Sequence, residues 1–344
     1  MRRACAIVIA VITLLASAAG SSIAQPETPR LTVAVGGQAL YIYLPLTLAQ
    51  QLGFFKDAGL DIEIVDVAGG AKALEALLGG SASVVCGFID HTIEMQAQGK
   101  SIRMFVLYDR YPGLVMALTK AGQAKGLKGI ADLRGAKIGV TAPGSSTNFF
   151  AEYLLAKAGI PVDQESYIGI GTAATAVAAA RRGVVDALVN VDPTITILTK
   201  NGDAQILADT RTTLGTLRVF GGPYPAGGLY ATPAFVERNP KTIQALATAS
   251  VRALQWIKTH TAQEIADRMP AEFYQADKAL YVSSLQENLE MFSPDGRVSL
   301  SGVQTIAKVL SAFDKSVVAN AGRISPSETF TNQFVEQAHQ MLRF

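Results

Sequence analysis

This chain of 344 residues has few cysteines and histidines, and neither sign of charge is in large excess. The sequence contains two cysteines and three histidines, and its 30 basic residues nearly balance its 28 acidic residues. No group of cysteines and histidines has the spacing of a metal site, so we predict neither a metal nor another cofactor. The near balance of charge disfavours a protein that binds nucleic acid or a charged membrane surface.

The first 24 residues have the pattern of a signal peptide that is cleaved near Ala24. Arg2 and Arg3 precede an uncharged apolar run over residues 4–16, which is shorter than the ~20 residues that cross a bilayer. An uncleaved membrane anchor is the alternative, and the short run disfavours it. We therefore expect a soluble periplasmic protein that begins near Gln25.

Loss of this leader leaves the mature chain with one cysteine and no net charge. Removing Arg2 and Arg3 reduces the 30 basic residues to 28, against 28 acidic ones. Cys86 is then the only cysteine, so no intramolecular disulfide can form. A buried apolar core must hold the fold, and a chain of this length is long enough for two domains.

Strand and helix patterns follow one another in the same order twice along the chain. Runs of β-branched residues indicate the strands, and Pro45 and Gly53 lie where a helix would begin and end. This alternation predicts an α/β fold with two similar lobes, each a mostly parallel sheet flanked by helices. The expected strands are residues 31–35, 61–67, 82–86, 137–141, 166–170 and 186–190, and the expected helices are residues 46–52, 71–78, 148–158 and 173–182.

The rest of the chain, from residue 232 onward, is predicted to be mostly helical. Prolines separate its helical segments, as expected of residues that interrupt helices. We expect this tail to pack on the first lobe, so that the chain crosses between the lobes near residues 114–118 and again near residues 227–231. The expected divisions are residues 25–115 and 228–344 for lobe 1, residues 116–227 for lobe 2, and tail helices at 241–260, 262–269, 278–291, 302–315 and 328–342.

The loop at residues 143–147 is the strongest candidate for ligand contact. In parallel α/β sheets, ligands bind beyond the carboxyl ends of the strands, where helix N-termini also point. Gly144 allows a close backbone approach, and Ser145, Ser146 and Thr147 supply hydroxyl groups. The free amides and the dipole at this helix N-terminus favour an anion. Alternatively, the three hydroxyls only cap the helix.

Other candidate residues occupy equivalent positions at strand ends and helix starts. Either Tyr41 or Tyr43 is expected to provide an aromatic wall, and Gln38 offers both a donor and an acceptor. Arg110 suits a carboxylate or sulfonate, although a pair with Asp109 on the rim is equally consistent with the sequence. The remaining candidates are Gly70, Asp90, His91, Asn190, Asp192 and Tyr224.

Several segments, in this order, resemble the nitrate/sulfonate/taurine substrate-binding proteins of ABC importers, a family that includes thiamine-pyrimidine-precursor binders. The segments are residues 49–64, 73–77, 132–140, 143–146 and 183–187. The resemblance implies a type II periplasmic-binding-protein fold, capture between closing lobes, and delivery to a membrane permease with a cytoplasmic ATPase. We expect a monomer. Ser83 departs from the family, which usually has an acidic residue there, and the candidate ligand loops match no subgroup of known ligand.

The ligand is expected to be larger than nitrate because aromatic side chains gather near the presumed cleft. An organic anion, such as an alkyl or aromatic sulfonate or an aromatic carboxylate, fits this composition. The alternatives are a neutral pyrimidine or other heterocycle, an enzyme of the same fold related to pyrimidine-precursor synthases, and a periplasmic sensory module. We predict no catalytic residues. The aromatic residues in question are Tyr41, Tyr43, Tyr108, Tyr111, Phe149 and Tyr224.

Overall fold

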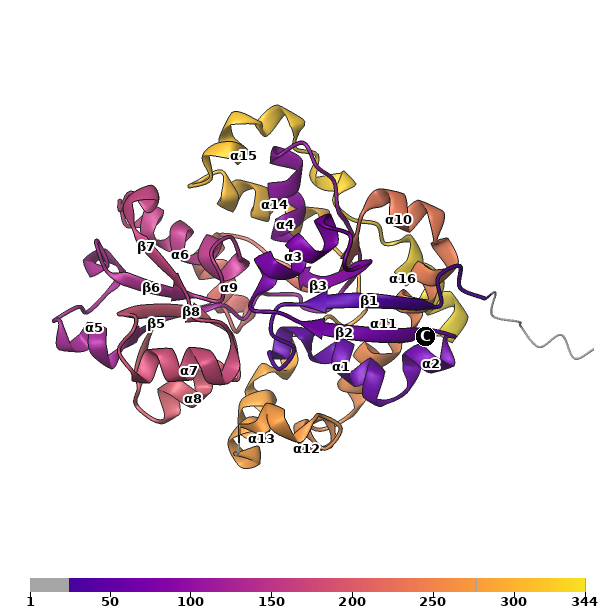
Figure 1. Cartoon of the computed structure of the whole chain (residues 1–344), viewed down its shortest axis with the longest axis horizontal. Helices are drawn as coiled ribbons and strands as arrows, with labels where there is room; N and C mark the ends of the chain where they lie inside the picture. The colour runs from indigo at the N-terminus through magenta and orange to yellow at the C-terminus, as the bar shows by residue number, and fades with distance from the viewer. Residues whose placement is uncertain (1–24, 276, 344) are drawn as a thin grey trace, which may run out of the picture.

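The computed structural model describes residues 25–275 and 277–343, and the predicted signal peptide lies outside these residues. It contains two five-stranded sheets, each flanked by helices, which lie end to end along the long axis (Figure 1). We call each sheet with its helices a lobe. The strand order is β2 (Asp61–Asp66), β1 (Arg30–Val35), β3 (Val84–Phe88), β10 (Gly227–Ala231), β4 (Arg103–Leu107) in the first sheet and β7 (Ser166–Gly169), β6 (Lys137–Val140), β8 (Ala187–Asn190), β5 (Val115–Thr119), β9 (Ala204–Asp209) in the second.

Both sheets are mostly parallel, as the sequence predicts, with one reversed strand in each. β1 pairs in parallel with β2 and β3, whereas β10 runs antiparallel between β3 and β4. β5 has the same antiparallel position between β8 and β9. The reversed strands are the two expected crossing segments. Each reversed strand begins on the side of its sheet that faces the other lobe. The parallel strands of the same sheet end on that side, so the reversed strand runs antiparallel to them. The division between lobes at residues 115/116 and 227/228 stays a prediction.

The helices of the two repeats lie between strands, as expected. The helix pattern at residues 71–78 forms α3, and the pattern at residues 148–158 forms α6, one or two residues earlier than expected. Five helices and one strand of the repeats that the sequence did not predict are also present, namely α2, α4, α5, α8, α9 and β9. The helix bounds are α1 (Leu44–Gln51), α2 (Phe54–Asp57), α3 (Gly70–Leu78), α4 (Asp90–Ala97), α5 (Lys120–Ala124), α6 (Ser146–Lys157), α7 (Ala173–Arg181), α8 (Thr194–Lys200) and α9 (Thr213–Phe220).

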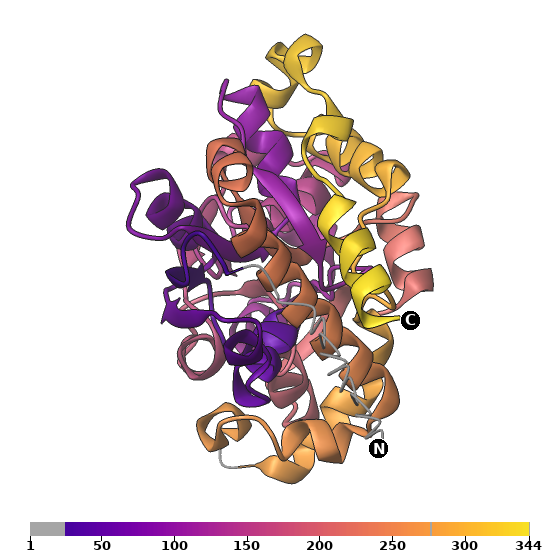
Figure 2. The ribbon, with the colours of Figure 1, turned by 90° about the vertical axis from the view of Figure 1, so that its right-hand side faces the viewer.

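The helical tail packs on the first lobe, which confirms the expectation from sequence. α11 packs against α1, α2 and α16, and it lies beside α16 in Figure 2. α14 and α15 pack against α4. No helix within the described residues has both the length and the apolar character needed to span a membrane. The tail helices are α10 (Pro233–Arg238), α11 (Pro240–Thr259), α12 (Ala262–Ala266), α13 (Lys278–Asn288), α14 (Leu300–Leu310), α15 (Lys315–Ala319) and α16 (Gln333–Leu342).

Gly228 in β10 is predicted to be important for stability because β10 lies between β3 and β4, which leave no room for a side chain at this position. A Cβ atom at this position would lie 2.2 Å from the carbonyl oxygen of Val106. We expect Gly228→Ala to lower the free energy of unfolding by about 1–3 kcal/mol, the usual cost of overpacking. Gly129→Ala is the control, because a Cβ atom there meets nothing within 4 Å. Urea unfolding of both variants tests this, and equal midpoints would contradict it.

Candidate ligand-binding site

A small cavity lies where the carboxyl ends of the two sheets meet. Its walls come from the segments that follow β1 and β2 and from the end of β3 in the first lobe, and from the segments that follow β6 and β8 in the second. The lobes are closed upon it, since only about 20 Å³ is open to the centre of a water-sized molecule. This is roughly the room that one water requires. The lining residues are Gly36, Leu40, Ile42, Tyr43, Gly70, Phe88, Thr141, Ser145, Ser146, Thr147 and Val191.

The N-termini of α3 and α6, one from each lobe, meet at this cavity. The backbone N–H of Ala71 in α3 donates to the Oγ of Ser145, which is the residue before α6, at 3.0 Å. The first amides of a helix have no partner within the helix, and the helix dipole makes this end attractive to an anion. Gly144, with a φ of +79°, forms the turn that brings the α6 N-terminus to the cleft. Two anion-attracting helix ends therefore converge on one space.

Ser146 connects the lobes through Asp90, the first residue of α4. The Ser146 hydroxyl donates to Oδ1 of Asp90 at 2.8 Å, and the Tyr224 hydroxyl donates to Oδ2 at 3.4 Å. Burial raises the pKa of the Asp90 carboxyl, although Ser146 and Tyr224 oppose the shift. Three residues that the sequence placed near a ligand are thus joined to one another in a buried network.

Glycines allow the backbones of the two lobes to approach one another closely. A Cβ atom at Gly69 would lie 3.0 Å from the Cβ of Ala142 in the second lobe, and Gly69 has a φ of +104°. A Cβ atom at Gly37 would lie 2.6 Å from Cγ2 of Thr172, again across the cleft. Larger residues at these positions would hold the lobes apart.

Of the two candidate tyrosines, Tyr43 lines the cavity. The Tyr41 hydroxyl instead donates to the carbonyl of Tyr281 in α13 at 2.8 Å, and the two rings meet edge to face. Tyr41 therefore packs between the first lobe and the tail.

Gln38 and Thr147 are occupied by contacts within their own lobes. The Gln38 side chain donates to Thr47, and its backbone N–H donates to Asp66 at 3.0 Å. Thr147 accepts from the backbone N–H of Thr141 at 3.0 Å and shares a second bond with the Thr141 hydroxyl. Thr147 still lines the cavity, whereas Gln38 is outside the lining set.

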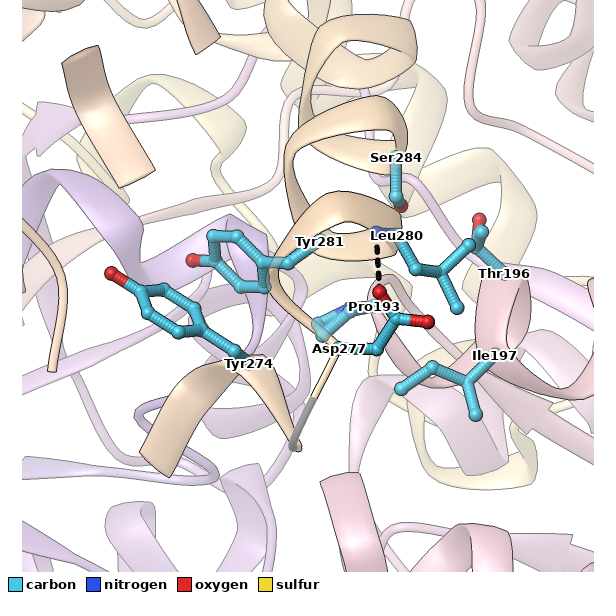
Figure 3. Close-up of a pocket in the computed structure, with 8 residues that line it drawn as sticks. All are labelled: Pro193, Thr196, Ile197, Tyr274, Asp277, Leu280, Tyr281 and Ser284. Atoms are coloured by element: carbon cyan, nitrogen blue, oxygen red, sulfur yellow. Dashed lines mark hydrogen bonds between the residues drawn. The ribbon is translucent and has the colours of Figure 1, made fainter. Parts of the chain in front are cut away.

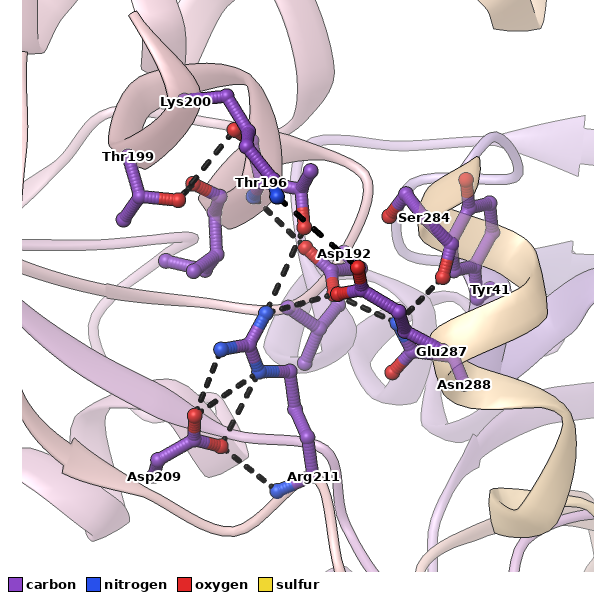
Figure 4. A network of polar contacts seen from close by, with 12 residues as sticks. Tyr41, Asp192, Thr196, Thr199, Lys200, Asp209, Arg211, Ser284, Glu287 and Asn288 are labelled. Carbon is purple, nitrogen blue, oxygen red and sulfur yellow. Dashed lines mark hydrogen bonds and ion pairs between the residues drawn. The ribbon is translucent and has the colours of Figure 1, made fainter. Parts of the chain in front are cut away.

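Asp192 joins the second lobe to the tail in a buried polar network (Figure 4). Its Oδ2 accepts from Arg211 Nη1 at 3.1 Å and from Asn288 Nδ2 of α13 at 2.7 Å. Its carbonyl accepts from the backbone N–H of Tyr41 at 3.0 Å. Asp192 thus forms a contact between lobes beside the cavity. The adjacent Asn190 caps its own loop, with Oδ1 accepting from the N–H of Val191 at 3.0 Å.

The surfaces of α8 and α13 meet next to this network. Figure 3 shows Ile197 and Thr196 of the second lobe facing Leu280 and Tyr281 of the tail. The space between them is only about 10 Å³ open to the centre of a water-sized molecule, so the two helices are nearly in full contact. The complete lining is Pro193, Thr196, Ile197, Tyr274, Asp277, Leu280, Tyr281 and Ser284.

The structure does not bring Arg110 to the cavity. Its guanidinium donates to the carbonyl of Glu290 and lies 3.8 Å from the Glu290 carboxylate, with 44% of the side chain exposed. Asp109, the other partner considered from the sequence, is fully buried instead. The cavity lining contains no lysine or arginine. Any anion there would depend on amides and hydroxyls for its hydrogen bonds.

Two α/β lobes that close on a cavity lined by helix N-termini define the fold of periplasmic substrate-binding proteins. The sequence model of the NMT1/THI5-like family matches residues 42–264, more than half of the chain, so the chain belongs to that family. This confirms the resemblance inferred from sequence.

Solved structures agree with this assignment. A protein from Bordetella bronchiseptica RB50 is 45% identical, with a TM-score of 0.90 over 93% of this chain and 100% of that chain. The periplasmic nitrate-binding protein NrtA from Synechocystis PCC 6803 is 17% identical, with a TM-score of 0.71 over 92% of this chain and 90% of that chain. The alkanesulfonate-binding protein SsuA from Xanthomonas axonopodis pv. citri, bound to MOPS, is 19% identical, with a TM-score of 0.69 over 90% and 99%. The last two likenesses concern the fold alone.

A group of acidic side chains also meets across the cleft, from α4, α6 and the start of α15. Burial, with the nearby carboxyls of Asp90 and Asp314, raises the pKa of Glu94 to about 8. Burial and Asp314 raise the pKa of Glu152 to about 7. Glu94 lies on the first lobe and Glu152 on the second, so closure of the lobes brings these acids together.

The raised pKa values predict that stability falls as the pH rises. The folded form retains the proton of Glu94 up to about pH 8 and that of Glu152 up to about pH 7, whereas the unfolded chain releases both near the ordinary glutamate pKa. The free energy of unfolding should therefore decrease as the pH rises between these values. We expect Glu94→Gln to raise Tm by several degrees at pH 8 and to change it little at pH 5. The exposed Glu63→Gln is the control, and a pH-independent effect of Glu94→Gln would contradict the assignment.

The Asp192 network predicts that α13 helps to hold the lobes closed. Asn288→Ala removes a buried hydrogen bond to a carboxylate, so the ligand-free protein should populate a more open form. Small-angle X-ray scattering would detect an increased radius of gyration. Lys200→Ala removes an exposed contact between the same elements, the 4.0 Å pair with Glu287, and should leave the radius unchanged. Identical scattering from the Asn288 variant and the unmodified protein would rule out this role.

Proposed function

We propose that this chain is an extracytoplasmic substrate-binding protein of an ABC importer, located in the periplasm. It captures a small organic anion between its lobes and delivers it to a membrane permease that works with a cytoplasmic ATPase. The convergence of the α3 and α6 N-termini on one cavity carries the proposal. Membership of the NMT1/THI5-like family and the likeness to structures of binding proteins support it.

The cavity has a polar side and an apolar side, which favours a ligand with an anionic group and an apolar body. Helix amides and the hydroxyls of Ser145 and Ser146 form the polar side, and such groups bind anions without any cationic side chain. Leu40, Ile42 and Phe88 form much of the apolar side. An alkyl or aromatic sulfonate, or an aromatic carboxylate, matches both. One structural neighbour is described as a nitrate-binding protein and another as an alkanesulfonate-binding protein.

Ligand capture operates through the equilibrium between open and closed lobes. A ligand shifts such an equilibrium only when it makes more contacts in one state than in the other. A group held between the α3 and α6 N-termini touches both lobes only after closure, so its binding energy favours the closed form. The permease can then recognise the closed form, which is the form that contains ligand.

A neutral nitrogen heterocycle is the second candidate ligand. The buried Asp90 carboxyl beside the cavity accepts hydrogen bonds, and the lining offers no lysine or arginine to balance an anion. A ring N–H or amino group would suit such an acceptor. Isothermal titration with benzenesulfonate, benzoate, nitrate and 4-aminopyrimidine separates the candidates. Binding of nitrate alone, or of 4-aminopyrimidine alone, would overturn the organic anion.

The serine hydroxyls at the start of α6 are predicted to contribute to ligand affinity. We expect Ser145→Ala and Ser146→Ala each to weaken binding of the best organic anion by about 1–3 kcal/mol, as for a lost hydrogen bond to a charged group. Ser301→Ala, an exposed serine at the start of α14, is the matched control and should bind normally. Unchanged affinity in both variants would limit these hydroxyls to their contacts between the lobes with Ala71 and Asp90.

A further inference from the structure

His91 carries a buried ring nitrogen for which the described residues supply no hydrogen bond of full geometry. The side chain is fully buried, and among the described residues its Nε2 has no hydrogen-bond partner. A buried polar atom without a partner costs free energy, so such an atom in a native site calls for an explanation. The neighbouring Asp90 does not supply the bond either, since its carboxyl oxygens accept from Ser146 and Tyr224 and not from Nε2.

The position of this nitrogen is the junction of the two lobes at the cavity. A Cβ atom built on Gly70, the first residue of α3 and part of the cavity lining, would lie 3.2 Å from Cε1 of His91 and 3.9 Å from its Nε2. The same point lies 3.9 Å from Oγ of Ser145. On the second lobe the backbone of Gly144 lies beside the ring and acts as a hydrogen-bond acceptor that opposes the lowering of the His91 pKa, but its geometry falls short of a full hydrogen bond to Nε2. The nitrogen thus lies between the N-termini of α3 and α6, directly behind Gly70 of the cavity lining, although His91 itself is outside the lining set.

The other ring nitrogen determines which of the two carries the proton. Nδ1 lies 3.2 Å from the hydroxyl of Tyr230, in a buried contact. A phenol is a stronger acid than a neutral imidazole, so the hydroxyl donates and Nδ1 accepts. Burial lowers the pKa of His91, which keeps the ring neutral. The single ring proton is then on Nε2, and Nε2 is a hydrogen-bond donor.

We propose that His91 donates from Nε2 to the anionic group of the ligand, with Tyr230 positioning its tautomer. The proposal rests on the proposed function and adds a specific donor to it. An oxyanion between the two helix N-termini would accept from helix amides and from this imidazole together. Such a site distinguishes a sulfonate or carboxylate from a neutral group of the same shape, because a neutral oxygen accepts more weakly.

Benzenesulfonate and its uncharged analogue benzenesulfonamide test the proposal by isothermal titration. His91→Leu should weaken benzenesulfonate binding about tenfold or more and affect benzenesulfonamide less. His91→Gln keeps an N–H donor near the position of Nε2 and should stay within a few-fold of the unmodified protein. Benzenesulfonate affinity that is equal in His91→Leu and the unmodified protein would overturn the role of His91 alone. Failure of the unmodified protein to bind any sulfonate or carboxylate would overturn the proposed function as well.

Nitrogen NMR of the unmodified protein gives an answer even if the leucine variant does not fold. The chain has three histidines, so replacing His260 and His339 singly with glutamine assigns the His91 resonances. We expect a neutral ring protonated at Nε2, and a shift of that resonance when benzenesulfonate is added. A ring protonated at Nδ1, or an Nε2 resonance that saturating benzenesulfonate leaves in place, would refute the assignment.

Discussion

The closed form depends on polar groups of each lobe finding their partners in the other. Ser145, Ser146 and Asp192 are buried by closure, and buried polar groups are costly unless they are hydrogen-bonded. Each finds a partner in the first lobe or its tail, namely the Ala71 amide, the Asp90 carboxyl and the Asn288 amide. Apolar contact alone would allow the lobes to slide. These directional bonds specify one closed arrangement, and they place the two helix N-termini opposite each other.

The carboxyl groups on the two sides of the cleft have different electrostatic surroundings. Beside α13, Asp192 is paired with Arg211, which also holds Asp209. Near α4 and α6, Asp90 is buried and Glu94 is partly buried, neither forms an ion pair with a described residue, and burial raises the pKa of both carboxyls. Opening therefore breaks favourable contacts on one side and relieves an electrostatic cost on the other. A small difference between large opposing contributions is what reversible capture requires, because ligand contacts can then decide the equilibrium.

The alternation of strands and helices could be predicted because its local signals are strong. Alternation of β-branched runs with helical segments that end at glycine placed the strands and helices of both repeats within a few residues. α4 was missed because it buries polar residues such as Asp90, His91 and Gln96 beside its apolar ones, so its sequence shows no separate polar and apolar faces. α8 was missed because its sequence, Thr-Ile-Thr-Ile-Leu-Thr-Lys, has the β-branched alternation typical of a strand. Tertiary packing decides both, with α4 packed on α14 and α15 and α8 on α7 and β9, and a single-sequence pattern does not contain such contacts.

The residues of the candidate site differ in the same way, since local signals predict some of them and long-range packing determines the others. The loop at residues 143–147 and Gly70 follow from one topological rule, that helix N-termini gather at the carboxyl ends of parallel strands. Asn288 could not be found in this way, because it reaches Asp192 from 96 residues further along the chain. The glycine pairs Gly36–Gly37 and Gly69–Gly70 also matter for contact between the lobes. From the sequence the first pair only follows a strand and the second is a helix start, yet Gly37 and Gly69 face the backbone and side chains of the opposite lobe. The glycine pairs after two successive strands therefore lie where the lobes meet on closure. They allow the close approach of the two lobes as well as the local turns.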